Sequence, residues 1–340
     1  MNGNYLKKIL NLLRKGYLDY CISSNYDEDY AKYFPSLSAR DVFKLSVHYP
    51  DSRYQTLVEI LRKKFKLGNI ILGDGCEDLI VRICQVIEDK NWKVGVVTPT
   101  FYRITDMLET YTLIPYKNLE NWNYRNLDAV WIINPNPLSG WILPKEVINT
   151  LVKDNPKTMF VVDETAIFFL QDWKKVSLLG NCNKTSNLIV LTSFSKFFGL
   201  SGLRVGFAAG NKNLLFEVNL RRLTFPISNL TSYIVEKVID KDDFLKRIRN
   251  KINKNKKEVE MILSKNPNIE TKPSDTNCVF CRLRNGQNLY KKLLEVGVIG
   301  LDLDSQLGIE EKGLVRLTIH SSRKRHNTLV DRLKKLGSQV

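Results

Sequence analysis

Short apolar runs rich in valine and isoleucine recur between residues 69 and 210, separated by longer stretches with helical periodicity. Each run has the length of a strand and is bounded by glycine, proline, asparagine or aspartate, which favour turns. The intervening patterns at 77–88 and 145–153 have the spacing of amphipathic helices. We predict buried strands within six segments: 69–74, 92–99, 128–137, 159–169, 187–196 and 204–210.

This alternation predicts an α/β fold in which helices cover both faces of a mostly parallel sheet. In open sheets of this kind, ligands bind beyond the carboxyl ends of the strands. The residues that directly follow each apolar run are therefore the first candidates for a functional site.

The pattern changes beyond Leu214, where long basic helices extend to about Leu263. Two strand-like runs follow, at 277–283 and 314–320, and then a helical pattern at 325–336. These segments predict a smaller α+β domain at the C-terminal end of the chain. We expect residues 30–240 to form the large domain, and residues 1–29 to join residues 241–340 in the small one.

The composition and charge of the chain limit the kinds of molecule that it is expected to bind. The chain has 340 residues and a net charge of +16, but its basic residues are spread out, and the densest run, 246–257, is typical of a solvated helix face. Because no zinc-finger, RNA-recognition or helix-turn-helix signature accompanies them, we expect no nucleic-acid partner. No run approaches the roughly 20 apolar residues that span a bilayer, and no secretory signal is recognisable. We expect a cytoplasmic protein without membrane contact, whose charge helps to attract anionic substrates.

The six cysteines do not have the spacing of a disulfide framework. Cys278 and Cys281 form a CxxC, but it lies within an apolar run and the sequence contains no second pair. A metal site at this motif is the alternative to ordinary core cysteines, and we expect core cysteines and no metal.

The segment with the most specific chemistry is TSFSKFFGLSGLRVGF, residues 192–207. Lys196 directly follows an apolar run that ends with Ser193 and Ser195, and Arg204 comes eight residues later in a glycine-rich turn. A primary amine can bind an aldehyde cofactor as a Schiff base, and hydroxyls with a guanidinium can hold its phosphate. A surface lysine beside ordinary turns is the alternative, and the combined pattern disfavours it.

This segment resembles the SxSKxxGLxGxRxG signature of class I and II aminotransferases, fold-type I enzymes that use pyridoxal 5'-phosphate (PLP). The resemblance covers most of the chain, with the motifs in the family's order. It is closest in pattern to histidinol-phosphate aminotransferases and threonine-phosphate decarboxylases. It implies that Lys196 carries PLP and moves the proton, and that Ser193, Ser195 and Arg204 hold the phosphate.

Three further residues acquire roles in cofactor binding from this resemblance. Asp163 ends an apolar run. It can be either a solvated residue at a strand end or a buried carboxylate that pairs with a protonated pyridine nitrogen, and the sequence leaves both alternatives open. The family places a carboxylate here for the second purpose. Cys76 and Glu77 follow a Gly-Asp-Gly turn at a helix start, where free N–H groups bind phosphate.

The remaining candidate residues are identified by the order of the motifs along the chain more than by their own chemistry. Phe101, in VVTPTFYRI, corresponds to the aromatic that stacks on the pyridine ring, although an aromatic after a strand is more often a core residue. Tyr49, in HYPD, corresponds to a tyrosine that reaches the phosphate in the other subunit, which implies a homodimer. Asn25 and Arg316 correspond to substrate-binding residues, with Arg316 gripping the α-carboxylate. A salt bridge at a strand edge is the alternative for Arg316.

Two positions depart from the family's pattern. NPNNPTG is replaced by NPNPLSG, so that Pro137 takes the place of the asparagine that donates to the cofactor's phenolic oxygen, unless Asn136 serves. The tyrosine that shares this task is replaced by Ala166. We expect cofactor binding to survive both changes, whereas the reaction stays open.

Three functions are compatible with this pattern. The first, which we favour because it is the commonest in the superfamily, is an aminotransferase acting on an amino acid or an amino-phosphate through Lys196. The second is a decarboxylase of a phosphorylated amino acid such as threonine or serine phosphate. The third is a PLP-binding protein without turnover.

Overall fold

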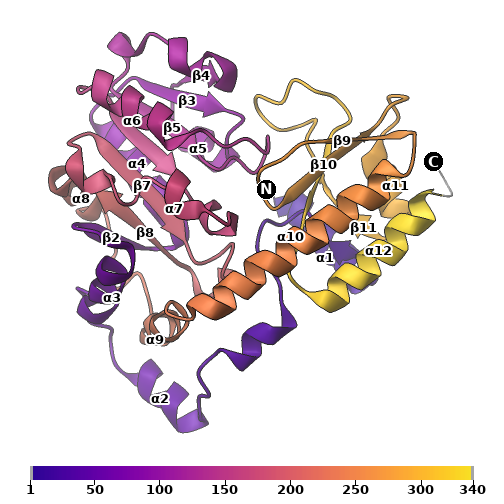
Figure 1. The fold of residues 1–340 in the computed structure, drawn as a ribbon. Coiled ribbons are helices and arrows are strands. Elements are labelled where there is room, and N and C mark those ends of the chain that lie inside the picture. The colour runs from indigo at the N-terminus through magenta and orange to yellow at the C-terminus, as the bar shows by residue number, and fades with distance from the viewer. Residues whose placement is uncertain (1–2, 338–340) are drawn as a thin grey trace.

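Seven strands form the large sheet of the protein, whose computed structural model describes residues 3–337 (Figure 1). Their order is β2-β8-β7-β6-β5-β3-β4. The pairs from β7 to β4 are parallel, and β8 is antiparallel to both of its neighbours. The strands are β2 (Ile70–Asp74), β3 (Val94–Thr98), β4 (Thr112–Pro115), β5 (Ala129–Ile133), β6 (Met159–Asp163), β7 (Leu188–Ser193) and β8 (Val205–Gly210).

Each of the six predicted segments contains one strand of this sheet, so the expected α/β fold with a mostly parallel sheet is confirmed. The prediction missed β4, which is short, lies at the sheet edge and exposes Leu113. An edge strand needs less apolar character than a central one, and β4 therefore lacked the valine and isoleucine run that marks the others.

Helices cover both faces of the large sheet. Alternate residues along a strand point to opposite faces, so Val161 packs with one set of helices and Val162 with the other. The first set is α4 (Gly75–Asp89), α5 (Tyr102–Asp106) and α8 (Lys212–Asn219). The second is α3 (Gln55–Phe65), α6 (Lys145–Asp154), α9 (Asn229–Val238) and the first half of α10 (Asp242–Ser264), with the short α7 (Trp173–Val176) beside them.

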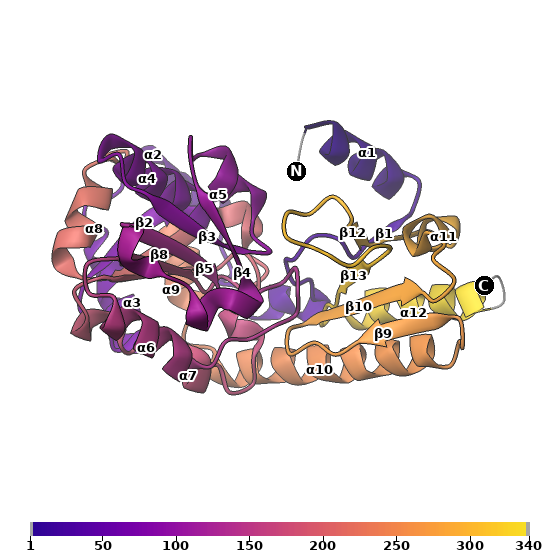
Figure 2. The same cartoon turned by 90° about the horizontal axis from the view of Figure 1, so that it is seen from above.

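A second, smaller unit lies beside the large sheet (Figure 2). Its antiparallel sheet has the order β12-β13-β10-β9, and a two-stranded parallel pair, β1 with β11, lies next to it. This α+β unit confirms the expected second part of the fold. Its elements are α1 (Gly3–Arg14), β1 (Leu18–Asp19), β9 (Ile269–Lys272), β10 (Cys278–Leu283), α11 (Leu289–Glu295), β11 (Val298–Ile299), β12 (Leu301–Asp302), β13 (Val315–Thr318) and α12 (Arg323–Gly337).

Helix α10 joins the two units (Figure 1). Phe244 and Ile248 in its first half pack into the core of the large sheet, and Val259 and Leu263 in its second half pack into the core of the small one. One continuous helix therefore contributes side chains to both cores. The domain division predicted at residues 240 and 241 falls at its start and stays a prediction.

The two cysteines of the CxxC motif have different apolar surroundings. Cys278 and Cys281 are buried in different apolar clusters, on opposite faces of β10. Within residues 3–337, no group of three or more His, Cys, Asp or Glu side chains is arranged to hold a metal ion. In the same part of the chain, no helix is long and apolar enough to cross a membrane.

Candidate active site

The candidate residues converge because strand ends of the large sheet meet at one edge. Asp163 and Ser193 are the last residues of the parallel strands β6 and β7. Strand β8 is antiparallel, so its start lies at the same edge, and Gly206 pairs there with Ser193. Lys196 and Arg204, which lie between β7 and β8, are thus held next to Asp163.

The first turn of α4 forms an open cradle at this edge. The helix starts at Gly75, whose φ of +68° is unfavourable for other residues, and Asp74 gives no side-chain cap to its N–H groups. A Cβ atom at Gly75 would lie 2.6 Å from Nη2 of Arg204, and one at Gly206 would lie 2.9 Å from the backbone nitrogen of Cys76. Glycine at both positions therefore lets the guanidinium and the helix start approach each other.

Hydroxyls and a guanidinium complete this cradle. Ser193 and Ser195 are buried, and the Ser195 N–H donates to Oγ of Ser193 at 2.9 Å. Nη2 of Arg204 donates to the carbonyl of Asp74 at 3.2 Å, which holds the guanidinium at the start of α4. Free N–H groups, two hydroxyls and a cation around one point are the donor set that binds a phosphate.

Lys196 lies half-buried beside this cradle. Burial lowers the pKa of its amine, the positive charges of Arg316 and Arg204 lower it further, and the carboxylate of Asp163 opposes them. A lower pKa increases the neutral fraction of the amine, which is the form that attacks an aldehyde. The loop is fixed by its backbone, because the carbonyl of Lys196 accepts from the Asn25 N–H at 2.8 Å.

Asp163 is a buried carboxyl group close to Lys196. Burial raises its pKa, and the N–H of Thr165, which donates to Oδ1 at 2.9 Å, and the charge of Lys196 oppose that rise. A buried carboxylate is costly without a cationic partner. A protonated ring nitrogen would supply that partner, so the surroundings of Asp163 fit PLP.

Asn136 and Phe101 occupy the neighbouring loops. Asn136 is buried, with Nδ2 donating to the Pro99 carbonyl at 2.7 Å and Oδ1 accepting from the Leu138 N–H at 2.9 Å. Its second amide hydrogen has no partner within residues 3–337, so one donor is left for a cofactor. Phe101 is 36% exposed, and Ala166 is buried in the apolar core.

Arg316 is a buried cation with no carboxylate partner among the described residues. Only 3% of the residue is exposed. Nη1 donates to the Pro137 carbonyl at 3.1 Å, and Nη2 donates to the Cys21 carbonyl and to Oγ of Ser23. Its Nε is buried without a partner in this part of the chain. The predicted alternative, a salt bridge at a strand edge, therefore has no counterpart in residues 3–337, and the charge is available to an anion.

Asn25 uses its side chain within the protein. Nδ2 donates to Oη of Tyr30 and to Oγ of Ser321, both at 3.0 Å, and Oδ1 accepts from the Ser321 N–H at 2.9 Å. These bonds connect the N-terminal segment with the residues after β13, and Tyr30 in turn donates to the Phe197 carbonyl in the Lys196 loop at 2.6 Å. The substrate-binding role expected for Asn25 stays a prediction, and the contacts indicate that it holds this segment in place.

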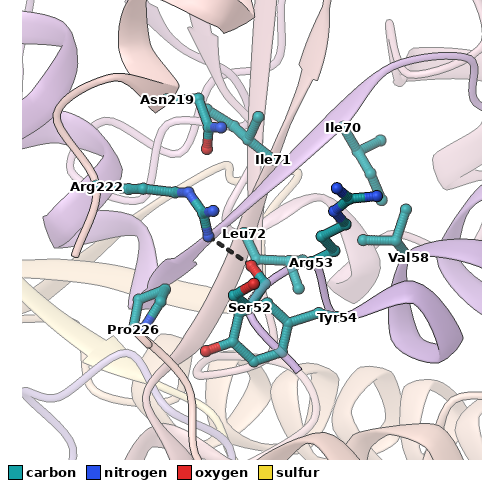
Figure 3. Close-up of a pocket in the computed structure, with 10 residues that line it drawn as sticks. All are labelled: Ser52, Arg53, Tyr54, Val58, Ile70, Ile71, Leu72, Asn219, Arg222 and Pro226. Carbon is teal, nitrogen blue, oxygen red and sulfur yellow. Dashed lines mark hydrogen bonds between the residues drawn. The ribbon is translucent and has the colours of Figure 1, made fainter. Parts of the chain in front are cut away.

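Tyr49 lies apart from the other candidates. It is 83% exposed and stacks on Phe225, with ring centroids 4.9 Å apart. Near these rings, a cavity of about 200 Å³ lies against the edge strand β2, and Arg222 donates there to the Ser52 carbonyl at 2.7 Å (Figure 3). None of the candidate residues lines this cavity. Among the described residues, the ring contact of Tyr49 is with Phe225 and not with another candidate, and its role at the phosphate of the other subunit stays a prediction.

Glu164 is a buried acid that the sequence analysis missed. Its carboxyl group accepts from the Leu178 N–H at 2.6 Å and contacts Oγ of Ser177 at 2.5 Å. Burial raises its pKa to about 8. Because Glu164 directly follows Asp163, these bonds fix the turn that carries Asp163. In the sequence, only the Asp-Glu pair after an apolar run could have indicated a buried acid at this position.

Comparisons with known proteins agree with this geometry. The family described as "Aminotransferase class I and II" matches residues 44–333. A histidinol-phosphate aminotransferase from Thermoanaerobacter sp. (strain X514) is 31% identical over 305 residues, which cover 85% of this chain and 84% of that protein. The predicted resemblance is therefore confirmed.

Two solved structures share the fold at lower identity. The histidinol-phosphate aminotransferase from Clostridium acetobutylicum has a TM-score of 0.82 at 21% identity, covering 95% of this chain and all 100% of that one. The L-threonine-O-3-phosphate decarboxylase from Porphyromonas gingivalis has a TM-score of 0.80 at 21% identity, covering 94% and 98%. Both likenesses concern the fold, which confirms the fold-type I assignment.

Glu164 predicts a pH dependence of stability. Because its pKa rises on folding from an ordinary value of 4.5 to about 8, the folded chain binds the proton more tightly than the unfolded chain. Its contribution to stability is fully present below pH 4.5 and is lost as the pH rises to about 8. Urea unfolding at several pH values measures this loss. We expect Glu164→Gln, which keeps both contacts without titrating, to remove most of the decline over this range, and an unchanged decline would contradict the assignment.

Proposed function

The chain belongs to the class I and II aminotransferases, a family of PLP-dependent enzymes, and from that premise we propose that it transfers an amino group between an amino acid or amino-phosphate and a keto partner, using PLP held at Lys196. The observation that carries this proposal is the half-buried amine of Lys196, whose pKa is lowered by burial and by two arginines. This amine lies near both the phosphate cradle and the guanidinium of Arg316, which has no carboxylate partner among the described residues.

The residues at this edge of the large sheet match the groups of PLP that would need binding partners. The backbones of Cys76 and Glu77, with Ser193, Ser195 and Arg204, would hold the phosphate. Asp163 would pair with the ring nitrogen, Phe101 would cover the ring, and Asn136 would donate to the phenolic oxygen. When bound, PLP supplies an aldehyde and an electron sink for the substrate's α-carbon.

Each of the protein's own groups then has a separate role in the reaction. Nζ of Lys196 holds and moves the proton at the substrate's α-carbon, because it is a base placed beside the cofactor position. Asp163 would stabilise a protonated ring nitrogen by its negative charge. Arg316 binds the anionic group of the substrate, and its planar fork fixes the orientation of that group. Burial of Arg316 and Asp163 strengthens both interactions by excluding water.

The substrate pair is a finer proposal. The relative that is 31% identical is named a histidinol-phosphate aminotransferase. Together with the net charge of +16, this name favours a phosphorylated amino substrate for this chain. The cytoplasmic location expected from the sequence stays a prediction.

A two-substrate assay tests the proposed reaction. The PLP-loaded protein is incubated with L-histidinol phosphate, O-phospho-L-threonine or L-glutamate, with and without 2-oxoglutarate or another keto acid. Transamination predicts at most one equivalent of product per site from a donor alone, and turnover only when a keto acid is added. Lys196→Ala should lower turnover by at least about 10³-fold, because base and cofactor linkage are lost together.

Other outcomes would contradict this proposal. Release of CO₂ without a keto acid would mean that the protein is a decarboxylase. PLP binding without any product from the three donors would favour a protein without turnover. Turnover that persists in Lys196→Ala would remove Lys196 from its proposed role.

We further propose that the active unit is a homodimer. Helix α2 (Ala39–Val47) buries none of its residues, and it extends away from the rest of the molecule (Figure 1). Phe43 and Val47 on this helix are exposed, as are Tyr49 and Phe225 next to it. A second copy covering these side chains would remove apolar surface from water, and the family resemblance implies that its Tyr49 would then reach the phosphate cradle.

Complementation tests this sharing of sites. Tyr49→Ala and Lys196→Ala chains should each be inactive as homodimers, whereas co-expression should restore about a quarter of the sites, because half of the dimers then contain one intact site. The matched control pairs Asp163→Ala with Lys196→Ala, which alter the same site and should restore nothing. A fully active monomer in light scattering would contradict the dimer.

A further inference from the structure

The loop between β5 and α6 contains the departure from the family's pattern at Pro137, and it contacts the small sheet. The Asp275 N–H donates to the carbonyl of Gly140 at 3.1 Å. A Cβ atom at Gly140, whose φ is +80°, would lie 2.9 Å from the ring of Phe280. Close backbone approach therefore joins this loop to the small unit.

Leu138 is inserted into an apolar cluster of the small sheet. Among the described residues, it is the one member of that cluster that precedes residue 278. Only 7% of Leu138 is exposed, and its apolar partners in this cluster all belong to the opposite unit. The other members are Cys278, Phe280, Leu303 and Leu314, with Leu301 and Ile309 packed against them.

Arg316 lies on the same face of the small sheet as this cluster. On β13 it is directly opposite Phe280 of β10 and Leu301 of β12, and cross-strand partners project to the same face. The Pro137 carbonyl, one residue before Leu138, accepts from Nη1 of Arg316 at 3.1 Å. The apolar contact and the hydrogen bond thus lie side by side.

We propose that Pro137 and Leu138 form an interdomain clamp, in which Leu138 holds the small sheet against the β5–α6 loop and the Pro137 carbonyl orients the guanidinium of Arg316 toward the substrate's anionic group. Leu138 is then a positioning residue that acts through Arg316. The clamp rests on the proposed function, because it takes Arg316 as the group that binds the substrate.

Neutral partners make this arrangement suitable for binding an anion. The partners of Nη1 and Nη2 are two carbonyl oxygens and a hydroxyl, so Arg316 is oriented without being neutralised. The fixed φ of proline limits the positions that the Pro137 carbonyl carbon can take. If the contact of Leu138 is lost, the small sheet can move away and Arg316 loses the acceptor that the β5–α6 loop provides. Weaker binding of anions should follow, because the competent arrangement becomes less populated.

The reactivity of Arg316 toward phenylglyoxal measures the clamp without a ligand. In the PLP-loaded protein, peptide mass mapping gives the modification rate of Arg316 in wild type and in Leu138→Ala. We expect a rate increase of about tenfold or more in the variant, since opening exposes the guanidinium. Leu293→Ala, which removes a fully buried leucine from the core of the small unit, is the matched control and should change the rate less than about twofold. Leu138→Met should restore slow modification.

Maleate, a small dicarboxylate, then tests whether Leu138 acts through Arg316. Its affinity is read from the visible absorbance of the PLP-loaded protein, and Leu138→Ala should weaken it by about tenfold, which is about 1.4 kcal/mol. In an Arg316→Lys background the same substitution should have no further effect. An equal loss in both backgrounds, or equal modification rates in Leu138→Ala and Leu293→Ala, would overturn the clamp.

These two readouts separate the clamp from the proposed function. A wild-type protein that binds no maleate would count against Arg316 as the anion site, whereas the modification rates would still support or overturn the clamp. If Leu138→Ala does not fold, Leu138→Val replaces it, with an intermediate rate expected and an unchanged rate contradicting the proposal.

Discussion

Lys196 is held in a place where its charge is unfavourable, and the rest of the site depends on this constraint. Burial and two nearby arginines lower the pKa of its amine, and the carboxylate of Asp163 opposes them. The large sheet creates the constraint, because the ends of β6 and β7 and the start of the antiparallel β8 meet at one edge. A sheet with a parallel β8 would carry Arg204 to the opposite edge and leave the phosphate cradle without its cation.

Placing Arg316 near Lys196 requires a second structural unit. Arg316 comes from the small sheet, and helix α10 connects the cores of both units. The N-terminal segment adds a further connection, since Asn25 binds the Lys196 loop through its backbone and Ser321 through its side chain. Contacts from three distant parts of the sequence thus determine the distance between amine and guanidinium, which must suit the size of the substrate.

Much of this architecture could be predicted from the sequence, and the reasons are local. Buried parallel strands need continuous runs of valine and isoleucine, and residues that follow such runs lie at the ligand-binding edge, which made Asp163 and Lys196 recognisable. The donors around Arg316 could not be predicted, because the Pro137 carbonyl and Oγ of Ser23 are brought to it by tertiary packing. The same holds for Asn25, whose amide is used by Tyr30 and Ser321, and for Glu164, whose raised pKa follows from burial.

The central claim, that Lys196 is the cofactor lysine, can be tested by reducing the PLP-loaded protein with borohydride and mapping the stable adduct by peptide mass spectrometry. Lys256 provides a stringent internal comparison, because burial also lowers the pKa of its amine while Nζ donates to the Thr276 carbonyl at 2.8 Å. Our account predicts one adduct per chain, on the peptide that contains Lys196. An adduct on Lys256 or any other lysine, or a PLP-loaded protein without a reducible adduct, would contradict it.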